Sequence, residues 1–340
     1  QDGKTNYIIL DEIQLVDDFI SVLLSLMHTP NTEIYVSGSN SRFLSKDVVT
    51  EFRGRGQEIR IWPLSFSEYY NTVGGERSLA WKDYYTFGGL PQILSLDSEA
   101  TKRTYLKEIY DVTYFRDIVD RNGIRNPEGL HQLLQILASI IGSSTNPKRI
   151  SNTFQSVSQI KIADKTITEY IKDIQDAYLI EEALRYDVKG RKYIGTETKF
   201  YFCDLGLRNI ALNFRQQEET HIMENIIYNE LRLRGYLVDV GMVECWSKDD
   251  NGKSKRSNLE VDFVVNNGAD RVYIQSAFNM PNEEKEKQER RSLTKIDDSF
   301  RKIIIVKDDI KKKIDEDGVI TMSLFDFLLD KKSIEKASND

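Results

Sequence analysis

Residues 7–14, YIILDEIQ, carry two adjacent carboxylates directly after an apolar stretch. At the end of a strand in a parallel sheet, Asp11 can hold Mg²⁺ while Glu12 orients or deprotonates the water that attacks a phosphate. An ordinary buried strand followed by a helix N-terminus, where acidic residues are favoured, explains the same residues equally well. The stretch by itself leaves both interpretations open.

A phosphate-binding loop, G-x-x-x-x-G-K-[ST], should accompany such an acidic pair and open a helix whose N-terminus faces the phosphates. Gly3-Lys4-Thr5 has the last three residues of this motif but runs directly into a predicted strand. Gly252-Lys253-Ser254 has them too, but Ser247 replaces the first glycine and no helical pattern follows. Both are interpreted as polar turns. We therefore expect the second half of an ATP site without the first, and no appreciable ATP hydrolysis by this stretch of sequence.

The composition predicts a globular protein. The 340 residues contain 47 Lys+Arg and 54 Asp+Glu, so the net charge of −7 argues against a wholly basic nucleic-acid-binding protein and leaves local basic patches open. Two cysteines and three histidines cannot build a disulfide framework or a Cys/His zinc site. No apolar run approaches the ~20 residues of a membrane span, and no signal peptide is recognised. We expect two or three domains, no membrane segment and a cytoplasmic location.

The N-terminal third has the pattern of a parallel α/β sheet with a helical region after it. Residues 6–12, 32–37 and 58–62 are β-rich, and the segment between the first two has a helical pattern. Strands that alternate with helices indicate a parallel sheet. Residues 76–120 are helical in pattern, with a rigid turn at 88–91, and we interpret them as a small lid.

The middle of the chain has the pattern of a winged helix. Helical patterns at 127–142 and 164–180 are followed by β-rich runs at 181–188 and 197–203, with a basic turn between the runs. Helices followed by a two-stranded ribbon with a charged tip are typical of this module.

The last segment has the pattern of a second α/β unit. It begins with an amphipathic helix at 221–234 and contains a charged run at 281–298, which we interpret as a solvated helix face. Its predicted strands are 236–240, 259–265, 271–277 and 302–306.

Several short motifs follow the acidic pair in a fixed order. They are SGSNS at 37–41, GRG at 54–56, PLSFSEY at 63–69 and GGLP at 88–91. Together with LDEIQ, this set resembles one group of bacterial and archaeal AAA-type ATPases, whose C-terminal half is a domain of uncharacterised function related to restriction endonucleases. The resemblance covers nearly the whole chain.

The resemblance implies an α/β protein of four parts. These are a partial P-loop AAA-type parallel sheet core at 1–75, a helical lid at 76–120, a winged helix at 121–205, and a degenerate α/β domain of the PD-(D/E)xK nuclease type at 206–335. It implies a protein that binds ATP and Mg²⁺ and couples its nucleotide state to the C-terminal modules. A non-enzymatic protein that binds nucleic acid or another protein, with a decayed ATP site, is the alternative.

The resemblance also assigns roles in the ATP site. Asp11 and Glu12 match the acidic pair, and Asn40, with Ser39, matches the sensor that contacts the terminal phosphate or the water. Arg55 matches an arginine that meets the developing charge, in cis or from a neighbouring subunit of a homo-oligomer. A surface salt bridge is the alternative for Arg55.

The C-terminal segment matches a nuclease site only in part. Nucleases of this fold place a Glu on the first helix, an Asp on a strand and Glu-x-Lys on the next strand. Glu224 and the pair Glu260/Asp262 match the first two elements, whereas Gln275 and Ala277 replace the Glu and the Lys of the third. Because an amide is a weak metal ligand and alanine carries no charge, we expect no metal-dependent cleavage. Polar structure held by hydrogen bonds is the alternative role for the acids.

The winged-helix interpretation supplies a candidate DNA contact, with basic residues touching phosphates. The basic residues are Lys161, Lys165 and Lys172 near the recognition helix, and Lys189, Arg191, Lys192 and Lys199 near the wing. The helix also carries Asp164, Glu169, Asp173 and Asp176. These acids weaken the case, and winged helices also contact proteins, so DNA and protein partners both stay open.

Overall fold

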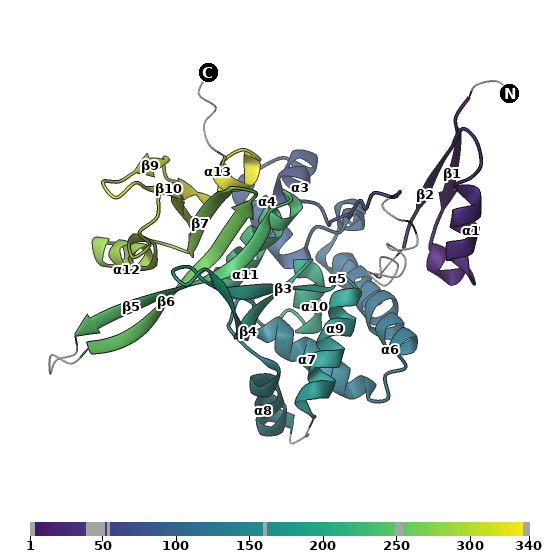
Figure 1. Ribbon diagram of the computed structural model, residues 1–340, viewed down its shortest axis with the longest axis horizontal. Helices are drawn as coiled ribbons and strands as arrows, with labels where there is room; N and C mark the ends of the chain where they lie inside the picture. Colours follow the sequence, from purple (N-terminus) through teal and green to yellow (C-terminus); the bar gives the residue numbers. More distant parts are fainter. Residues whose placement is uncertain (1–3, 39–51, 53–54, 159–161, 249–253, 336–340) are drawn as a thin grey trace.

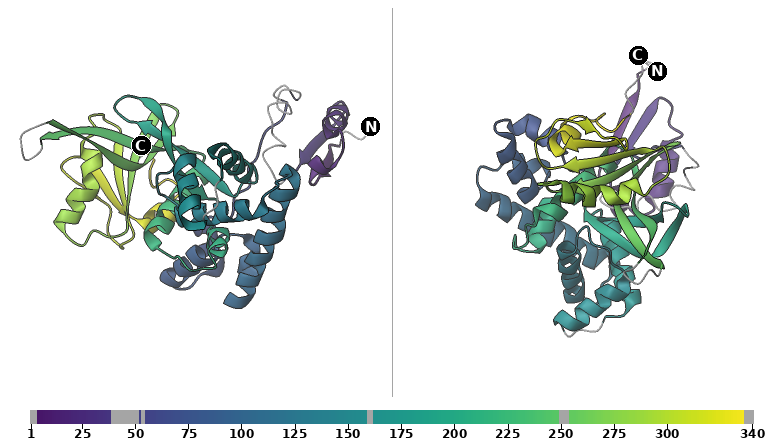
Figure 2. Two further views of the ribbon diagram at one scale, coloured as in Figure 1. Left: turned by 90° about the horizontal axis from the view of Figure 1, so that it is seen from below. Right: turned by 90° about the vertical axis from the view of Figure 1, so that its left-hand side faces the viewer.

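The structure is a computed structural model and describes residues 4–38, 52, 55–158, 162–248 and 254–335. Three groups of elements follow one another along the chain: an N-terminal α/β unit, a run of helices, and a C-terminal sheet with helices on both faces (Figure 1). Figures 1 and 2 show the N-terminal unit beside the helices and away from the C-terminal sheet. No helix among the described residues is long and apolar enough to cross a membrane.

The N-terminal unit is a pair of parallel strands joined by a helix. Strand β1 (Asn6–Leu10) pairs with β2 (Thr32–Val36), and α1 (Phe19–Leu26) makes the crossover after the short 3₁₀ helix η1 (Ile13–Leu15). The register runs from Asn6↔Thr32 to Leu10↔Val36, so both strands end at the same edge. The predicted parallel arrangement of these two strands is confirmed.

The predicted strand at 58–62 is wrong. This segment joins no sheet among the described residues and is held by side chains instead. The Arg60 guanidinium lies 3.8 Å from the centroid of the Trp62 ring and forms an ion pair with Glu181. A β-rich composition produces a strand only where a neighbouring strand supplies backbone hydrogen bonds, and none of the described strands does so here.

The middle of the chain is helical, with local signals that fix the ends of the helices. Ser65 and Glu68 form a capping box at the start of α3, and Asn126 caps α7 directly before Pro127. The helices are α3 (Phe66–Val73), α4 (Arg77–Phe87), η3 (Pro91–Ser95), α5 (Glu99–Glu108), the π-helical η4 (Ile109–Arg116), α6 (Asp117–Asn122), α7 (Pro127–Ser139), α8 (Pro147–Ser158) and α9 (Asp164–Asp176). The helical patterns of α7 and α9 are confirmed, whereas the polar sequence of α8 gave no recognisable helical pattern.

The C-terminal sheet has eight strands in the order β4-β3-β5-β6-β7-β8-β10-β9. The strands are β3 (Ile180–Asp187), β4 (Lys192–Phe202), β5 (Leu237–Lys248), β6 (Ser254–Asn267), β7 (Asp270–Ala277), β8 (Arg301–Val306), β9 (Lys313–Ile314) and β10 (Val319–Ser323). Strand β3 pairs with β5 from Arg185↔Val240 to Asp187↔Met242. The ribbon expected to form a separate wing is therefore part of the same sheet as the C-terminal strands.

Helices cover both faces of this sheet. The long helix α11 (Glu219–Leu233) contributes to one hydrophobic core, and α12 (Glu283–Thr294) contributes Leu293 to a second, smaller core on the other face. Two short helices, α10 (Leu205–Ala211) and α13 (Leu324–Leu329), complete the fold. The larger core also includes the middle helices, so helices and sheet pack as one body of buried residues.

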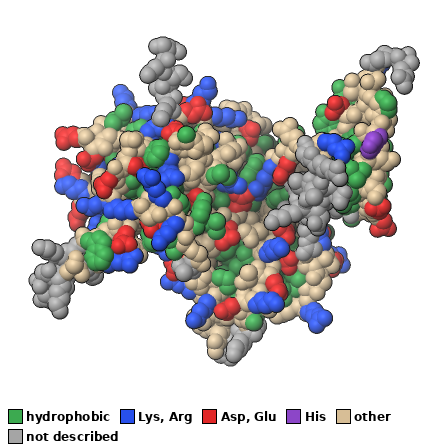
Figure 3. All heavy atoms as spheres, viewed as in Figure 1, with side chains coloured by type: hydrophobic (Ala, Val, Ile, Leu, Met, Phe, Trp, Pro, Cys, Tyr) green, Lys and Arg blue, Asp and Glu red, His purple; other side chains and the backbone are tan. Residues whose placement is uncertain are grey.

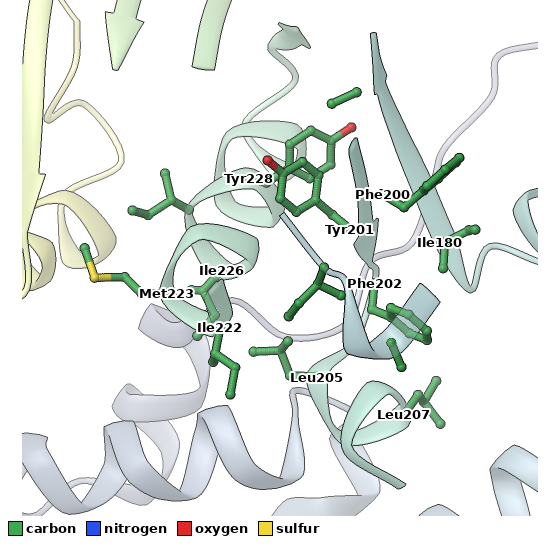
Figure 4. Packing of buried hydrophobic residues seen from close by; sticks show 14 of the residues in the cluster. Ile180, Phe200, Tyr201, Phe202, Leu205, Leu207, Ile222, Met223, Ile226 and Tyr228 are labelled. Carbon is green, nitrogen blue, oxygen red and sulfur yellow. The ribbon is translucent and has the colours of Figure 1, made fainter. Parts of the chain in front are cut away.

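The end of β4 packs against α10 and α11 (Figure 4). Phe202 of β4, Leu205 of α10 and Ile226 of α11 are buried together there. The rings of Tyr201 and Tyr228 stack with their centroids 4.2 Å apart. These contacts pack β4 and α10 against α11.

Asp204, directly after β4, joins this region to the turn at 88–91. Its carboxylate caps α10 by accepting the Leu207 N–H (3.0 Å) and also accepts the Gly89 N–H (2.7 Å). Burial raises the pKa of Asp204 to about 6, whereas these backbone donors favour the charged form. Gly88 has φ +79° and lies so close that a Cβ would be 2.2 Å from Asp204 Oδ1.

We expect Gly89→Ala to destabilise the protein, because its Cβ would lie 2.3 Å from the backbone oxygen of Leu64. Overpacking of this kind costs about 1–3 kcal/mol. Urea denaturation followed by circular dichroism measures the change. Gly195→Ala is the control, since nothing lies within 4 Å of its Cβ position. Equal stability of the two variants would contradict the packing argument.

Candidate functional site

The acidic pair lies at the carboxyl edge of the N-terminal sheet. Asp11 and Glu12 follow β1 and Ser37 follows β2, so the parallel pairing brings them together. The Ser37 hydroxyl donates a hydrogen bond to Asp11 Oδ1 and accepts one from the Glu12 N–H (3.1 Å). Glu12 takes a left-handed backbone conformation, φ 48°. A carboxylate and a hydroxyl are oxygen ligands of the kind Mg²⁺ prefers, so this edge fits the cation.

The other expected residues of this site are placed only in part. Ser39 and Asn40 lie outside the described residues. Arg55 is exposed, and its backbone N–H donates to the carbonyl of Phe52 (2.9 Å). Both interpretations of Arg55 therefore stay predictions.

Gly3, Gly252 and Lys253 of the two Gly-Lys-Thr/Ser stretches lie outside the described residues, and no helix follows directly after either stretch. Strand β1 begins directly after Thr5, and strand β6 begins at Ser254. Both stretches therefore lead into strands, as expected for turns and not for phosphate-binding loops.

A second group of ionisable residues lies inside the C-terminal half. We call it the Lys199 cluster, and its members are Lys199 of β4, Glu224 of α11, and Glu260 and Asp262 of β6. The Lys199 Nζ lies 2.7 Å from Glu260 Oε1, 2.9 Å from Glu224 Oε1 and 3.9 Å from Asp262 Oδ1. Lys199 is only 3% exposed. Three carboxylates from two elements thus converge on one buried ammonium.

A break in the register of β5 and β6 helps to aim Asp262. Asp239 pairs with Val264 and Gly241 with Val261, so two residues of β6, Asp262 and Phe263, oppose one residue of β5. Such a bulge bends the strand locally and can turn adjacent side chains to one face, as is common beside functional sites. Phe263 belongs to the core on the α11 side, and Asp262 lies on that side with Glu224.

Each carboxylate of the Lys199 cluster has a second partner. Asp262 Oδ2 accepts the Ser276 N–H (2.8 Å), and Glu224 Oε1 accepts the Tyr201 hydroxyl (2.7 Å). Glu260 Oε2 accepts the Ser144 hydroxyl (3.3 Å). The carboxylates are therefore held in place from outside the cluster.

The electrostatics of the Lys199 cluster favour a charged lysine. Burial opposes the charged form of Lys199, but Glu224, Asp262 and Glu260 outweigh burial and raise the pKa of Lys199 above its ordinary value. Burial, and then the charge of Glu224, raises the pKa of Asp262 well above its ordinary range, while Lys199 opposes this. The ammonium is the charge that allows these acids to be buried together.

Two sequence expectations change here. Gln275 does not join the cluster, because its Oε1 accepts the Ser292 hydroxyl of α12 (3.3 Å), and its neighbours Tyr273 and Ala277 belong to the core under α12. Lys199 lies on the ribbon strand β4, as expected, but the expectation that it touches a phosphate is wrong, because Lys199 is buried among the acids. Only its place directly before three aromatic residues, Phe200 to Phe202, hints that it is buried.

The ribbon tip between β3 and β4 presents its basic residues to solvent. Lys189, Arg191 and Lys192 are exposed, and Asp187 Oδ1 accepts the Gly190 N–H (2.8 Å) to close the turn. On α9, Lys165 forms an ion pair with Glu169. Lys161 lies outside the described residues. Figure 3 shows basic and acidic side chains interspersed over one face of the molecule, so any basic contact would be local.

Comparison with known proteins gives the class of the N-terminal segment. Residues 1–70 match a family model described as an AAA domain. Residues 78–218 match a model described as a domain of unknown function, DUF8612. Residues 1–70 are therefore similar to an AAA-type domain.

The family is shown by a whole-chain relative. An uncharacterised protein of Haemophilus influenzae is 32% identical over 328 residues, which cover 95% of this chain and 77% of that protein. The chain belongs to the same family as that protein. The uncharacterised protein MJ1544 of Methanocaldococcus jannaschii is 31% identical over 297 residues, covering 84% of this chain and 64% of MJ1544.

Solved structures were also matched, among them the one that follows. Protein VC1899 from Vibrio cholerae covers 97% of this chain and 90% of its own, with 10% identity and a TM-score of 0.25.

We expect no cleavage of single- or double-stranded DNA or RNA with Mg²⁺ or Mn²⁺, because the third nuclease element is missing and a lysine occupies the centre of the acids. The paired change Gln275→Glu/Ala277→Lys should not create activity, since both positions lie on the α12 side of the sheet. Gel assays of both proteins test this. Metal-dependent cutting that disappears in Asp262→Ala would refute it.

Proposed function

We propose that the whole protein is an AAA-type ATPase whose nucleotide state acts on the helical and C-terminal parts of the chain. The observation that carries this proposal is the contact of Asp11 with Ser37 at the shared carboxyl edge of β1 and β2, inside the AAA match. Ligands of α/β proteins bind at this edge of a parallel sheet.

In this proposal each residue of the edge has one task. Asp11 holds Mg²⁺, Glu12 orients the attacking water, and Ser39 and Asn40 contact the terminal phosphate or that water. Arg55 meets the charge on the phosphoryl group, in cis or from a neighbouring subunit of a homo-oligomer. The bound cation would neutralise phosphate charge.

The exposed face of the N-terminal sheet supports a larger sheet in the whole protein. Tyr7, Ile9 and Tyr35 are exposed large apolar side chains on these two strands, and Ile9 is 77% exposed. Two parallel strands with a solvated apolar face are not stable by themselves, because parallel sheets are normally covered on both faces. We propose that further elements, including a phosphate-binding loop, complete this sheet in the whole protein.

The remaining parts are proposed as a helical lid at 76–120, a winged helix at 121–205 and an inactive nuclease-like module at 206–335. The convergence of Glu224, from a helix, with Asp262, from a strand, supports the nuclease-like origin. The pairing of β3 with β5 makes the last two parts share one sheet. A conformational change in one part would therefore be transmitted to the other through the shared sheet.

ATP turnover by the whole protein tests the first proposal. Glu12→Gln should lower kcat by about 100-fold or more, because a general base contributes at least this factor, and should leave nucleotide binding intact. Asp11→Asn should weaken the Mg²⁺ dependence of turnover. Glu33→Gln removes an exposed carboxylate from the neighbouring strand and serves as the control.

The outcomes separate the alternatives. Unchanged turnover in Glu12→Gln would mean that the phosphate site lies elsewhere. Absence of both nucleotide binding and turnover in the whole protein would favour the second candidate, an interaction protein with a decayed ATP site.

That second candidate is favoured by one observation, the exposed basic tip formed by Lys189, Arg191 and Lys192. Any DNA binding should be weak, insensitive to sequence and dominated by phosphate interactions of this tip. The Lys189/Arg191/Lys192 triple alanine variant should therefore flatten the slope of log affinity against log salt, by nearly one unit for each phosphate that the tip neutralises. Fluorescence anisotropy titrations at several salt concentrations measure the slope.

The control for this experiment is a triple alanine variant at Lys311, Lys312 and Lys332, which are exposed and lie elsewhere in the chain. It removes the same charge, so a general effect of net charge would appear in both variants. Equal slopes for wild type and the tip variant would show that the tip does not bind the DNA.

A further inference from the structure

The Lys199 cluster has the arrangement of a cation site, with the cation supplied by the chain. Three carboxylates surround the Lys199 ammonium, and Glu224 and Glu260 approach it within 2.9 and 2.7 Å. A simple buried ion pair needs one acid for one base, as in the pair of Arg234 with Glu230. Three acids around one lysine are more than charge neutralisation requires, so the cluster needs an explanation other than a simple ion pair.

The second partners of the acids support a site built to hold a cation. Tyr201, Ser144 and the Ser276 N–H each orient one carboxylate from outside. Hydrogen bonds from neighbouring groups that orient the metal-ligating side chains are a general property of metal sites. Gly142, with φ +68°, adds close packing, since a Cβ there would lie 3.1 Å from both carboxylate oxygens of Glu224.

The dimensions of the cluster are close to those of a metal site. Oxygen ligands lie about 2.3–2.6 Å from Ca²⁺, compared with 2.7 and 2.9 Å from the Lys199 Nζ to its two nearest oxygens. Glu224 and Glu260 would need to move inward by only a few tenths of an ångström, whereas Asp262 Oδ1, 3.9 Å from the Lys199 Nζ, would need to move by roughly 1.3 Å. No group of three or more His, Cys, Asp or Glu side chains in the described ranges is arranged to hold a metal ion in this structure.

We propose that the Lys199 ammonium takes the place of a divalent metal ion among Glu224, Glu260 and Asp262, and that removing it opens a site for Ca²⁺ or Mn²⁺. The wild-type protein then binds no metal ion at this cluster. An ion can enter past Glu260, whose side chain is 34% exposed, whereas the other two acids are deeply buried.

Calorimetric titration with Ca²⁺ and with Mn²⁺, without nucleotide, tests this in the whole protein. All variants carry Asp11→Asn so that the N-terminal edge does not contribute. With Lys199 present, Asp262→Asn should change nothing in the titration. Lys199→Ala should bind one additional ion per chain, and Lys199→Ala/Asp262→Asn should lose most of that affinity, at least about 10-fold as for the loss of a metal ligand's support.

Folding provides the second readout, because Lys199→Ala leaves buried acids without their cation. The thermal midpoint of Lys199→Ala should rise with added Ca²⁺, while that of Lys199→Ala/Asp262→Asn should not. Lys102→Ala is the matched control, since Lys102 is a largely buried lysine paired with one acid, Asp83. It should gain neither metal binding nor metal-dependent stability.

Three results would overturn the proposal. Wild type could bind an ion that Asp262→Asn abolishes, which would mean that lysine and metal share the site. Lys199→Ala could fold without gaining a metal ion, which would make the cluster an ordinary charge network. Lys199→Ala could also fail to fold even with Ca²⁺ while Lys199→Met/Asp262→Asn folds, which would mean that an ion cannot replace the ammonium. None of these measurements involves ATP turnover, so the results are independent of the proposed ATPase.

Discussion

A buried ammonium must be neutralised, and this requirement at Lys199 organises much of the structure. To meet it, β4 contributes the lysine, α11 contributes Glu224 and β6 contributes Glu260 and Asp262. None of these charges could be buried alone without a cost of several kcal/mol. Strand β4 at the edge of the sheet is therefore tied to α11 and β6 by charge as well as by apolar packing.

The same segment makes a second connection a few residues later. Asp204 follows β4 and accepts the Gly89 N–H, and the Gly89 carbonyl in turn accepts the N–H of Leu64 (2.8 Å). Nearby, Arg60 pairs with Glu181 of β3, which also pairs with Arg232 of α11. The stretch from Arg60 to Leu64 lies within the residues that match the AAA domain, so a movement there would reach β3, β4 and α11 through these contacts.

The two groups of acids in the protein differ in how their charge is compensated. Asp11 is exposed at an open sheet edge, where water and a hydrated cation have access and where a serine hydroxyl contacts the carboxylate. In the Lys199 cluster, burial removes water, and a charge from the chain itself takes over. Acidic residues thus suit cation binding at the exposed edge and pairing with a lysine in the buried cluster, because their solvation differs.

The sequence by itself determined what depends on neighbours along the chain. The apolar run into Asp11 and Glu12, the pairing of two nearby strands, the capping box at Ser65 and the turn at 88–91 all follow from local composition and spacing. Tertiary structure alone decided that 58–62 is not a strand, that Gln275 faces α12, and that Lys199 meets acids 25 to 63 positions away in the sequence. These features depend on strand order and on a bulge between β5 and β6, and a one-residue shift in a strand exchanges its two faces. The local sequence pattern does not specify such a shift, so the register of the strand is fixed only when the whole sheet is assembled.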